Sequence, residues 1–240
     1  IKSIALQHGV IYSKAGNGIC HQIHLERFSA PGKTLIGSDS HTPTSGGIGS
    51  LAIGAGGLDV SIAIAKGYYY MEVPKVVNVY LINKLNPFVS AKDVILSILR
   101  DLTVKGGVGT IFEYSGPGLK TLSVTDRATI ANMGAELGAT TSIFPSDEIT
   151  KDFLVRQKRE NDYIELIADF ESEYAEQITV DLSTIVPFTA KPHMPDNVVP
   201  VTDVAIKVDQ VIIGSCTNSS YTDMMRVASI LKNKKVHQDV

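Results

Sequence analysis

The sequence contains no tryptophan and only two cysteines, and neither sign of charge dominates it. Cys20 and Cys216 are isolated from each other, so a disulfide framework is not expected and a reducing compartment is. There are 22 Lys and Arg against 25 Asp and Glu, giving a net charge of −3. This balance provides no basic excess for nucleic acid or anionic lipid. No apolar run approaches the roughly 20 residues of a membrane helix, so we expect no membrane association.

What is present is ordinary for a globular protein: 44% hydrophobic and 20% charged residues in 240 positions. That length suits one large domain or two of usual size. A proline-rich stretch over 187–200 resembles a connector, and a weaker seam lies at 71–74. We therefore expect units at 1–75, 76–193 and 194–240.

Strand and helix patterns alternate along the chain. The predicted strands cover 33–37, 76–82, 121–124, 198–204 and 208–213. The predicted helices cover 47–68 (apolar and buried), 90–104 (amphipathic), 126–137 and 221–232, with two more, solvent-facing, in the charged stretch 147–176. This alternation predicts an α/β fold with mostly parallel sheets.

The first candidate site follows the strand at 33–37. Asp39, Ser40 and His41 lie between that strand and a glycine-rich helix start. Ligands of open α/β sheets bind at such strand ends, where loops and helix N-termini converge. A polar turn that caps the next helix through Ser45 is the alternative interpretation.

Glycines in the same stretch partly fit a dinucleotide fingerprint, Gly47-x-Gly49-x-x-Ala52. The match is weak, because residues 38–46 separate it from the strand and Glu72 is the only acid near the expected position. His21 and His24, beside Cys20, invite a zinc interpretation, yet a structural zinc site needs four ligands. One histidine in a cleft and one in a structural role is the preferred interpretation.

Two further candidates lie later in the chain. Asn132 and Glu136 are four residues apart, which places them on one face of a helix. Their neighbours are small and apolar, so the carboxylate would be partly desolvated and available to a histidine. Cys216 is predicted at a junction of strand and helix, where backbone N–H groups favour a thiolate, as nucleophile or metal ligand. No Cys-His triad spacing is evident, so the metal ligand is preferred, although one cysteine cannot hold a metal alone. A small buried residue is the alternative.

Six motifs occur in a fixed order and together resemble the aconitase family of iron–sulfur hydro-lyases over essentially the whole chain. They are His21-Gln22-Ile23, Gly37-Ser38-Asp39-Ser40-His41-Thr42-Pro43, Thr103-Val104-Lys105-Gly106-Gly107, Glu113-Tyr114-Ser115-Gly116-Pro117-Gly118, the run 132–141 (NMGAELGATT) and Gly214-Ser215-Cys216-Thr217-Asn218-Ser219. The resemblance implies three-layer α/β/α domains.

The resemblance also implies a 4Fe–4S cluster held by three cysteines, with one open iron acting as a Lewis acid. Cys216 matches the first cluster ligand, and Cys20 matches none. Four further matches are implied: Asp39 and His41 near the open iron, Ser40 as a substrate contact and Asn132 as a polar residue beside the cluster. His21 is expected to pair with Asp39, and Glu136 with His41. Such carboxylate–imidazole pairs fix tautomers and hold protons for a departing hydroxyl.

Other elements of the family pattern are not found in this sequence: the Cys-x-x-Cys motif with the other two ligands, an upstream Asp-His pair, and the mobile domain with its serine base and arginines. We therefore expect an internal piece of a longer chain, inactive alone. Within that chain it would isomerise citrate and isocitrate through cis-aconitate, in the cytoplasm or, in a eukaryote, the mitochondrial matrix. The alternatives are a 3-isopropylmalate or homoaconitate dehydratase large subunit, or a non-catalytic or RNA-binding module, which the net charge disfavours.

Overall fold

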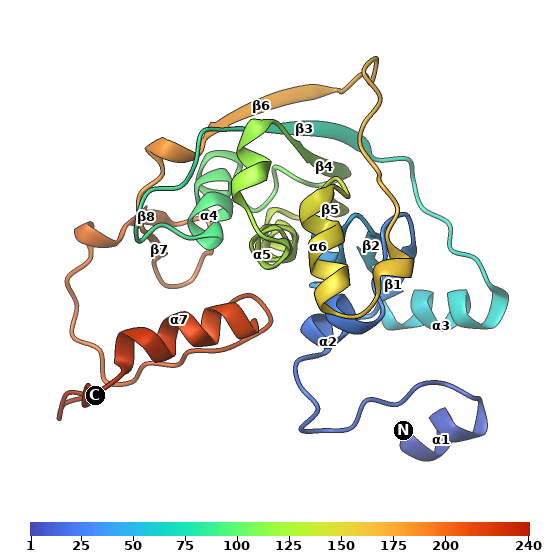
Figure 1. Cartoon of the computed structure of the whole chain (residues 1–240), viewed down its shortest axis with the longest axis horizontal. Helices are drawn as coiled ribbons and strands as arrows, with labels where there is room; N and C mark the ends of the chain where they lie inside the picture. The colour runs from blue at the N-terminus through green and yellow to red at the C-terminus, as the bar shows by residue number, and fades with distance from the viewer.

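Short strands and helices alternate along residues 1–240, all of which the computed structural model describes (Figure 1). The α-helices are α1 (Lys2–Gln7), α2 (Cys20–Arg27), α3 (Gly57–Lys66), α4 (Ala91–Leu102), α5 (Val124–Met133), α6 (Glu148–Arg156) and α7 (Tyr221–Leu231). The strands are β1 (Thr34–Gly37), β2 (Leu51–Gly54), β3 (Lys75–Ile82), β4 (Thr110–Ser115), β5 (Thr141–Ile143), β6 (Glu176–Asp181), β7 (Phe188–Ala190) and β8 (Val198–Pro200). Three 3₁₀ helices matter for the site: η1 (Thr42–Ile48), η2 (Pro117–Thr121) and η3 (Gly134–Leu137).

The main sheet has four parallel strands in the order β5-β4-β3-β6. Strands β1 and β2 form a second, parallel pair, and β7 and β8 form an antiparallel pair. The predicted α/β class with mostly parallel sheets is therefore confirmed. The division into units at 1–75, 76–193 and 194–240 stays a prediction.

The larger core lies between this sheet and the helices beneath it (Figure 1). Burial alternates along β4, and β3 turns Val77, Val79 and Leu81 inward. Helix α4 packs its apolar face against them, as its amphipathic pattern predicted. It begins where expected because Ser90 and Asp93 form a capping box.

A smaller core joins α2, η1, α5 and α6 through Leu25, Ile48, Val124, Ala128 and Leu154. The approach of η1 to α5 depends on glycine. A Cβ on Gly47 would lie 2.5 Å from the backbone N of Ala128. The glycines of this stretch therefore serve close packing between elements.

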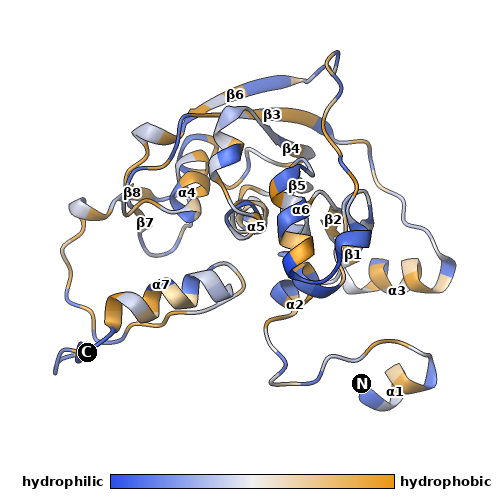
Figure 2. Ribbon diagram, viewed as in Figure 1, coloured by the Kyte–Doolittle hydropathy of each residue, from blue (hydrophilic) through white to orange (hydrophobic).

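The predicted helix at 47–68 is wrong. Gly49 takes a left-handed conformation (φ 86°) that ends η1, and the chain then enters β2, which pairs with β1. Within this stretch only 57–66 is α-helical, and none of α3 is buried, although its residues are largely apolar (Figure 2). The run of Ala, Ile and Gly thus contains a strand as well as a helix. No helix in the structure is long and apolar enough to cross a membrane.

Other boundaries also differ from the prediction. Residues 121–124 form no strand, because η2 ends there and Ser123 is the N-cap of α5. The strand at 198–204 is reduced to β8, and 208–213 has no strand partner. The charged stretch 147–176 contains one α-helix, α6, rather than two. Strands β4, β5 and β6 were not predicted.

Candidate functional site

The segment that follows β1 contains Asp39, whose carboxylate is hydrogen-bonded to His21 of helix α2. His21 Nε2 lies 2.8 Å from Asp39 Oδ1, and the backbone N–H of His41 donates to the same oxygen at 2.8 Å. These two hydrogen bonds, the backbone one first, lower the pKa of Asp39 below its usual range. The His21 side chain is largely covered, whereas that of Asp39 is 58% exposed. A fixed imidazole thus holds a solvent-facing carboxylate.

A second imidazole lies between an amide and a carboxylate. His41 Nδ1 is 2.8 Å from Asn132 Oδ1, and its Nε2 is 3.5 Å from Glu136 Oε1. Asn132 lies in the last turn of α5, and Glu136 lies in η3, which continues that helix. The predicted placement on one helix face therefore brings both side chains to the same histidine, at opposite ring nitrogens.

Cys216 reaches this cluster from the far end of the chain. Its Sγ lies 3.9 Å from Asn132 Oδ1, and Gln22 Nε2 donates to its backbone oxygen at 3.0 Å. Thr217 Oγ1 lies 2.9 Å from the same Asn132 oxygen. The expected setting of Cys216 is wrong, because no strand precedes it and α7 begins only after the N-cap Ser220. Side-chain contacts, rather than a helix terminus, hold it in place.

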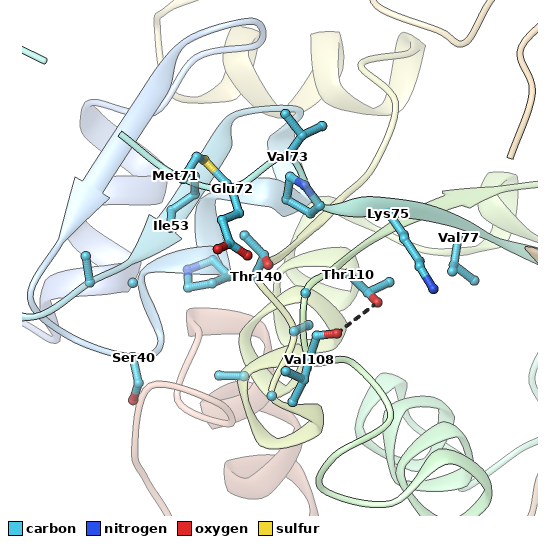
Figure 3. A pocket seen from close by; sticks show the side chains of 18 of the residues that line it. Ser40, Ile53, Met71, Glu72, Val73, Lys75, Val77, Val108, Thr110 and Thr140 are labelled. Atoms are coloured by element: carbon cyan, nitrogen blue, oxygen red, sulfur yellow. Dashed lines mark hydrogen bonds between the residues drawn. The ribbon is translucent and has the colours of Figure 1, made fainter. Parts of the chain in front are cut away.

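Ser40 lies beside a cavity of about 1180 Å³ between β2, the segment 69–75 and the turns at 106–110 and 138–140. Figure 3 shows Ser40 at one end of this cavity and Lys75 and Thr110 toward the other, with Glu72 between. The neighbours of Ser40, Asp39 and His41, do not line it. The predicted site residues therefore divide between a cavity wall and a hydrogen-bonded cluster beside it.

The zinc and nucleotide interpretations fail on geometry. His24 Nδ1 bonds to Ser29 Oγ at 2.8 Å, and burial, followed by the charges of His21 and Arg159, lowers its pKa. No group of three or more His, Cys, Asp or Glu side chains in the structure is suited to a metal ion. The glycine fingerprint leads into a strand instead of a helix, so it is no dinucleotide site.

Two functional candidates were missed from the sequence. Thr44 donates to the His41 backbone oxygen at 2.6 Å and lies 2.7 Å from Asn132 Nδ2. Thr217 bonds to the same amide from the other side, and its backbone oxygen accepts from Thr129 at 3.1 Å. Thr217 lies inside a quoted motif and Thr44 directly follows another, and this position in the sequence was the available signal.

Several known proteins are similar to this chain over nearly its whole length. The chain is 43% identical over 251 residues to the mitochondrial homocitrate dehydratase of Saccharomyces cerevisiae, covering 97% of the chain and 32% of that protein. It is 43% identical over 241 residues to 3-isopropylmalate dehydratase large subunit 2 of Archaeoglobus fulgidus, covering 100% of the chain and 58% of that protein. It is 42% identical over 254 residues to the mitochondrial aconitate hydratase of S. cerevisiae, covering 99% of the chain and 33% of that protein.

The chain thus spans between about a third and somewhat over half of these relatives. The profile described as "Aconitase family (aconitate hydratase)" matches residues 1–205 and 202–240, which together cover the chain. With the ordered motifs and the two imidazole–carboxylate contacts, this match shows that the chain belongs to the aconitase family.

Proposed function

We propose that this chain is the part of an aconitase-type hydro-lyase that supplies acid–base groups and one cluster ligand. Its substrate would be a small hydroxy-tricarboxylate, with citrate and isocitrate interconverted through cis-aconitate. The observation that carries the proposal is the pair of contacts His21–Asp39 and His41–Glu136 beside Cys216. Dehydration needs a base to remove a C–H proton and an acid to protonate the leaving hydroxyl. Paired imidazoles and carboxylates suit the second task.

In this proposal His21 holds the Asp39 carboxylate in its charged form toward the substrate. His41 and Glu136 hold a proton between them for the departing hydroxyl, and Ser40 contacts the substrate from the cavity side. Asn132 lies behind both His41 and Cys216, fully buried. Orientation by a buried partner keeps the imidazole aligned without a cost at the moment of reaction.

The donor set fits only part of the proposed 4Fe–4S cluster. Cys216 is half-buried with its sulfur near polar side chains, as a ligand at the edge of a cluster would be. Cys20, the other cysteine, is exposed. A cluster bound by three cysteines therefore requires two thiolates from outside these residues. When bound, such a group supplies a Lewis acid for the substrate's hydroxyl and carboxylate.

The substrate choice within the family stays open between close alternatives. Identities of 43%, 43% and 42% to relatives named for homocitrate, isopropylmalate and aconitate differ too little to separate them. A role as a 3-isopropylmalate or homoaconitate dehydratase large subunit is therefore the runner-up. A large subunit implies a partner chain, and an aconitate hydratase implies further domains, so completion of the site from elsewhere is part of either proposal. The matrix is the proposed compartment for a eukaryotic source, and the cytoplasm for others.

A chimera tests the proposed chemistry. Residues 1–240 would replace the matching stretch of yeast aconitate hydratase, and citrate dehydration would be followed after cluster reconstitution. We expect turnover in the chimera and neither turnover nor bound iron in the chain alone. His41→Ala should abolish turnover, whereas the matched control Asp101→Asn, on the exposed side of α4, should not. Citrate turnover by the isolated chain would overturn the proposal, as would an active His41→Ala chimera.

A further inference from the structure

Asn132 is buried to 0% exposure, and both ends of its amide are engaged. Oδ1 faces His41 Nδ1 at 2.8 Å, and Nδ2 faces Thr44 Oγ1 at 2.7 Å. The orientation of the Asn132 amide decides the role of His41 Nδ1. An amide oxygen facing Nδ1 requires that nitrogen to donate, whereas an amide nitrogen there would require it to accept.

Thr44 decides this orientation. Its hydroxyl has a single hydrogen, and that hydrogen is donated to the backbone oxygen of His41 at 2.6 Å, an atom that can only accept. Toward Asn132 the hydroxyl must therefore act as acceptor. Rotating the amide by half a turn would either bring two acceptor oxygens to 2.7 Å with no hydrogen between them or make Thr44 give up its 2.6 Å bond to His41, in a site with no water access.

The other neighbours of the amide do not change this result. The Thr217 hydroxyl, at 2.9 Å, can donate to Oδ1 or accept from a nitrogen there. Cys216 Sγ, at 3.9 Å, lies at the outer limit for a sulfur hydrogen bond. Thr44 alone imposes a direction.

We infer that the Thr44–Asn132 pair fixes the tautomer of His41, with the proton on Nδ1 and Nε2 left free toward Glu136. Both residues are positioning residues, since they act through the imidazole. Nε2 and Glu136 Oε1, 3.5 Å apart, can then share one proton without competition from the other ring nitrogen. The use of that proton rests on the proposed function, but the tautomer does not.

The tautomer can be read directly by nitrogen-15 NMR of the histidine side chains at alkaline pH, where the rings are neutral. The chain has six histidines, and His41→Gln identifies the signal in question. We expect His41 predominantly protonated at Nδ1. A His41 ring protonated at Nε2 would overturn the inference, whatever the chimera's activity.

Variants of Thr44 test whether this residue fixes the tautomer of His41. Thr44→Val keeps the shape but removes the hydroxyl, so the amide can rotate and the His41 signal should shift toward the Nε2-protonated form. Thr44→Ser should retain the Nδ1 form. His24, bonded through Nδ1 to Ser29, is the internal control and should be unchanged in both. An unaltered His41 tautomer in Thr44→Val would refute the role of Thr44, and the wild-type spectrum still tests the tautomer if that variant does not fold.

Discussion

Removing Asp147 should be among the most destabilising single changes in this chain. Its carboxylate accepts from both terminal nitrogens of Arg127, at 2.7 and 2.9 Å. The Arg127 side chain is 0% exposed and also donates to the backbone oxygens of Leu119 and Pro145. Asp147 in addition caps α6 by accepting from the Ile149 N–H at 3.1 Å. One side chain therefore neutralises a buried charge and begins a helix.

The expected magnitude follows from these two roles. Breaking a buried ion pair by removing one partner costs about 3–5 kcal/mol, because a charge is left uncompensated. Loss of an Asp N-cap costs about 1 kcal/mol. Because Asp147 is 27% exposed and water can partly replace it, we expect Asp147→Ala to lower the free energy of unfolding by about 4 kcal/mol in all.

Urea denaturation followed by circular dichroism measures this loss. The matched control is Asp101→Ala, which breaks the exposed pair with Arg100 and should cost less than about 1 kcal/mol. The double change of Arg127→Met with Asp147→Leu should be less destabilising than Asp147→Ala, because no charge is left buried. A loss below about 1 kcal/mol for Asp147→Ala would refute the reasoning.

The same pair predicts an acid dependence. Burial alone would raise the pKa of Asp147, but the hydrogen bonds and charge of Arg127 outweigh it and lower the pKa below its ordinary 3.8. A carboxyl whose pKa is lowered by folding stabilises the protein above its unfolded pKa, and that stability is lost as pH falls through the folded value. Asp147→Asn should therefore show a shallower loss of stability below about pH 4 than the wild type.

Three further outcomes follow from the structure. Gly47→Ala should lower the free energy of unfolding by about 2 kcal/mol or more in urea titration, because its Cβ would meet the backbone of Ala128. In the chimera, Asp39→Asn and His41→Ala should reduce citrate turnover far more than citrate affinity, and a loss confined to binding would contradict their assignment to the chemistry. Amides of residues 211–213 should exchange rapidly with deuterium in the 240-residue chain, since no strand partner protects them, and slowly in the chimera if the predicted strand forms there.

The parts of the fold that the sequence predicted are those with a strong local pattern. The strand at 76–82 is rich in β-branched residues and is mostly covered, and the helix at 90–104 has both an apolar stripe and a Ser90–Asp93 cap. Each of these signals is contained within one element. These two elements could be predicted without knowing their contacts with residues distant in the sequence.

The failures share a different cause. Residues 51–54 become a strand because they pair with β1, a partner that local periodicity cannot identify. Strand β6 begins with Glu176 and Gln177, both exposed, so its pattern lacks the apolar run typical of a parallel strand. The apolar helix α3 was predicted to be buried and is exposed. In each case contacts between elements, rather than composition, determined the result.

The candidate site likewise has a part that the sequence predicted and a part that depends on contacts between elements. Residue chemistry alone pointed to the strand end at Asp39 and to the shared face of Asn132 and Glu136, and the resemblance supplied the pairing. Neither could predict the Thr44 hydrogen bonds, which exist because Gly47 lets η1 pack against α5.

The exposure of the cluster residues separates two kinds of role. Asn132 is fully buried, His41 is 22% exposed, Glu136 37% and Asp39 58%. Groups that exchange protons with a substrate must be reachable, whereas groups that hold orientation gain strength from exclusion of water. Substitutions of the exposed residues Asp39 and Glu136 should therefore alter the chemistry with little loss of stability. Substitution of the buried Asn132 should alter both the chemistry and the stability. Because the buried Thr44–Asn132 pair sets the tautomer of His41, the solvent-facing His41–Glu136 pair keeps a defined proton position.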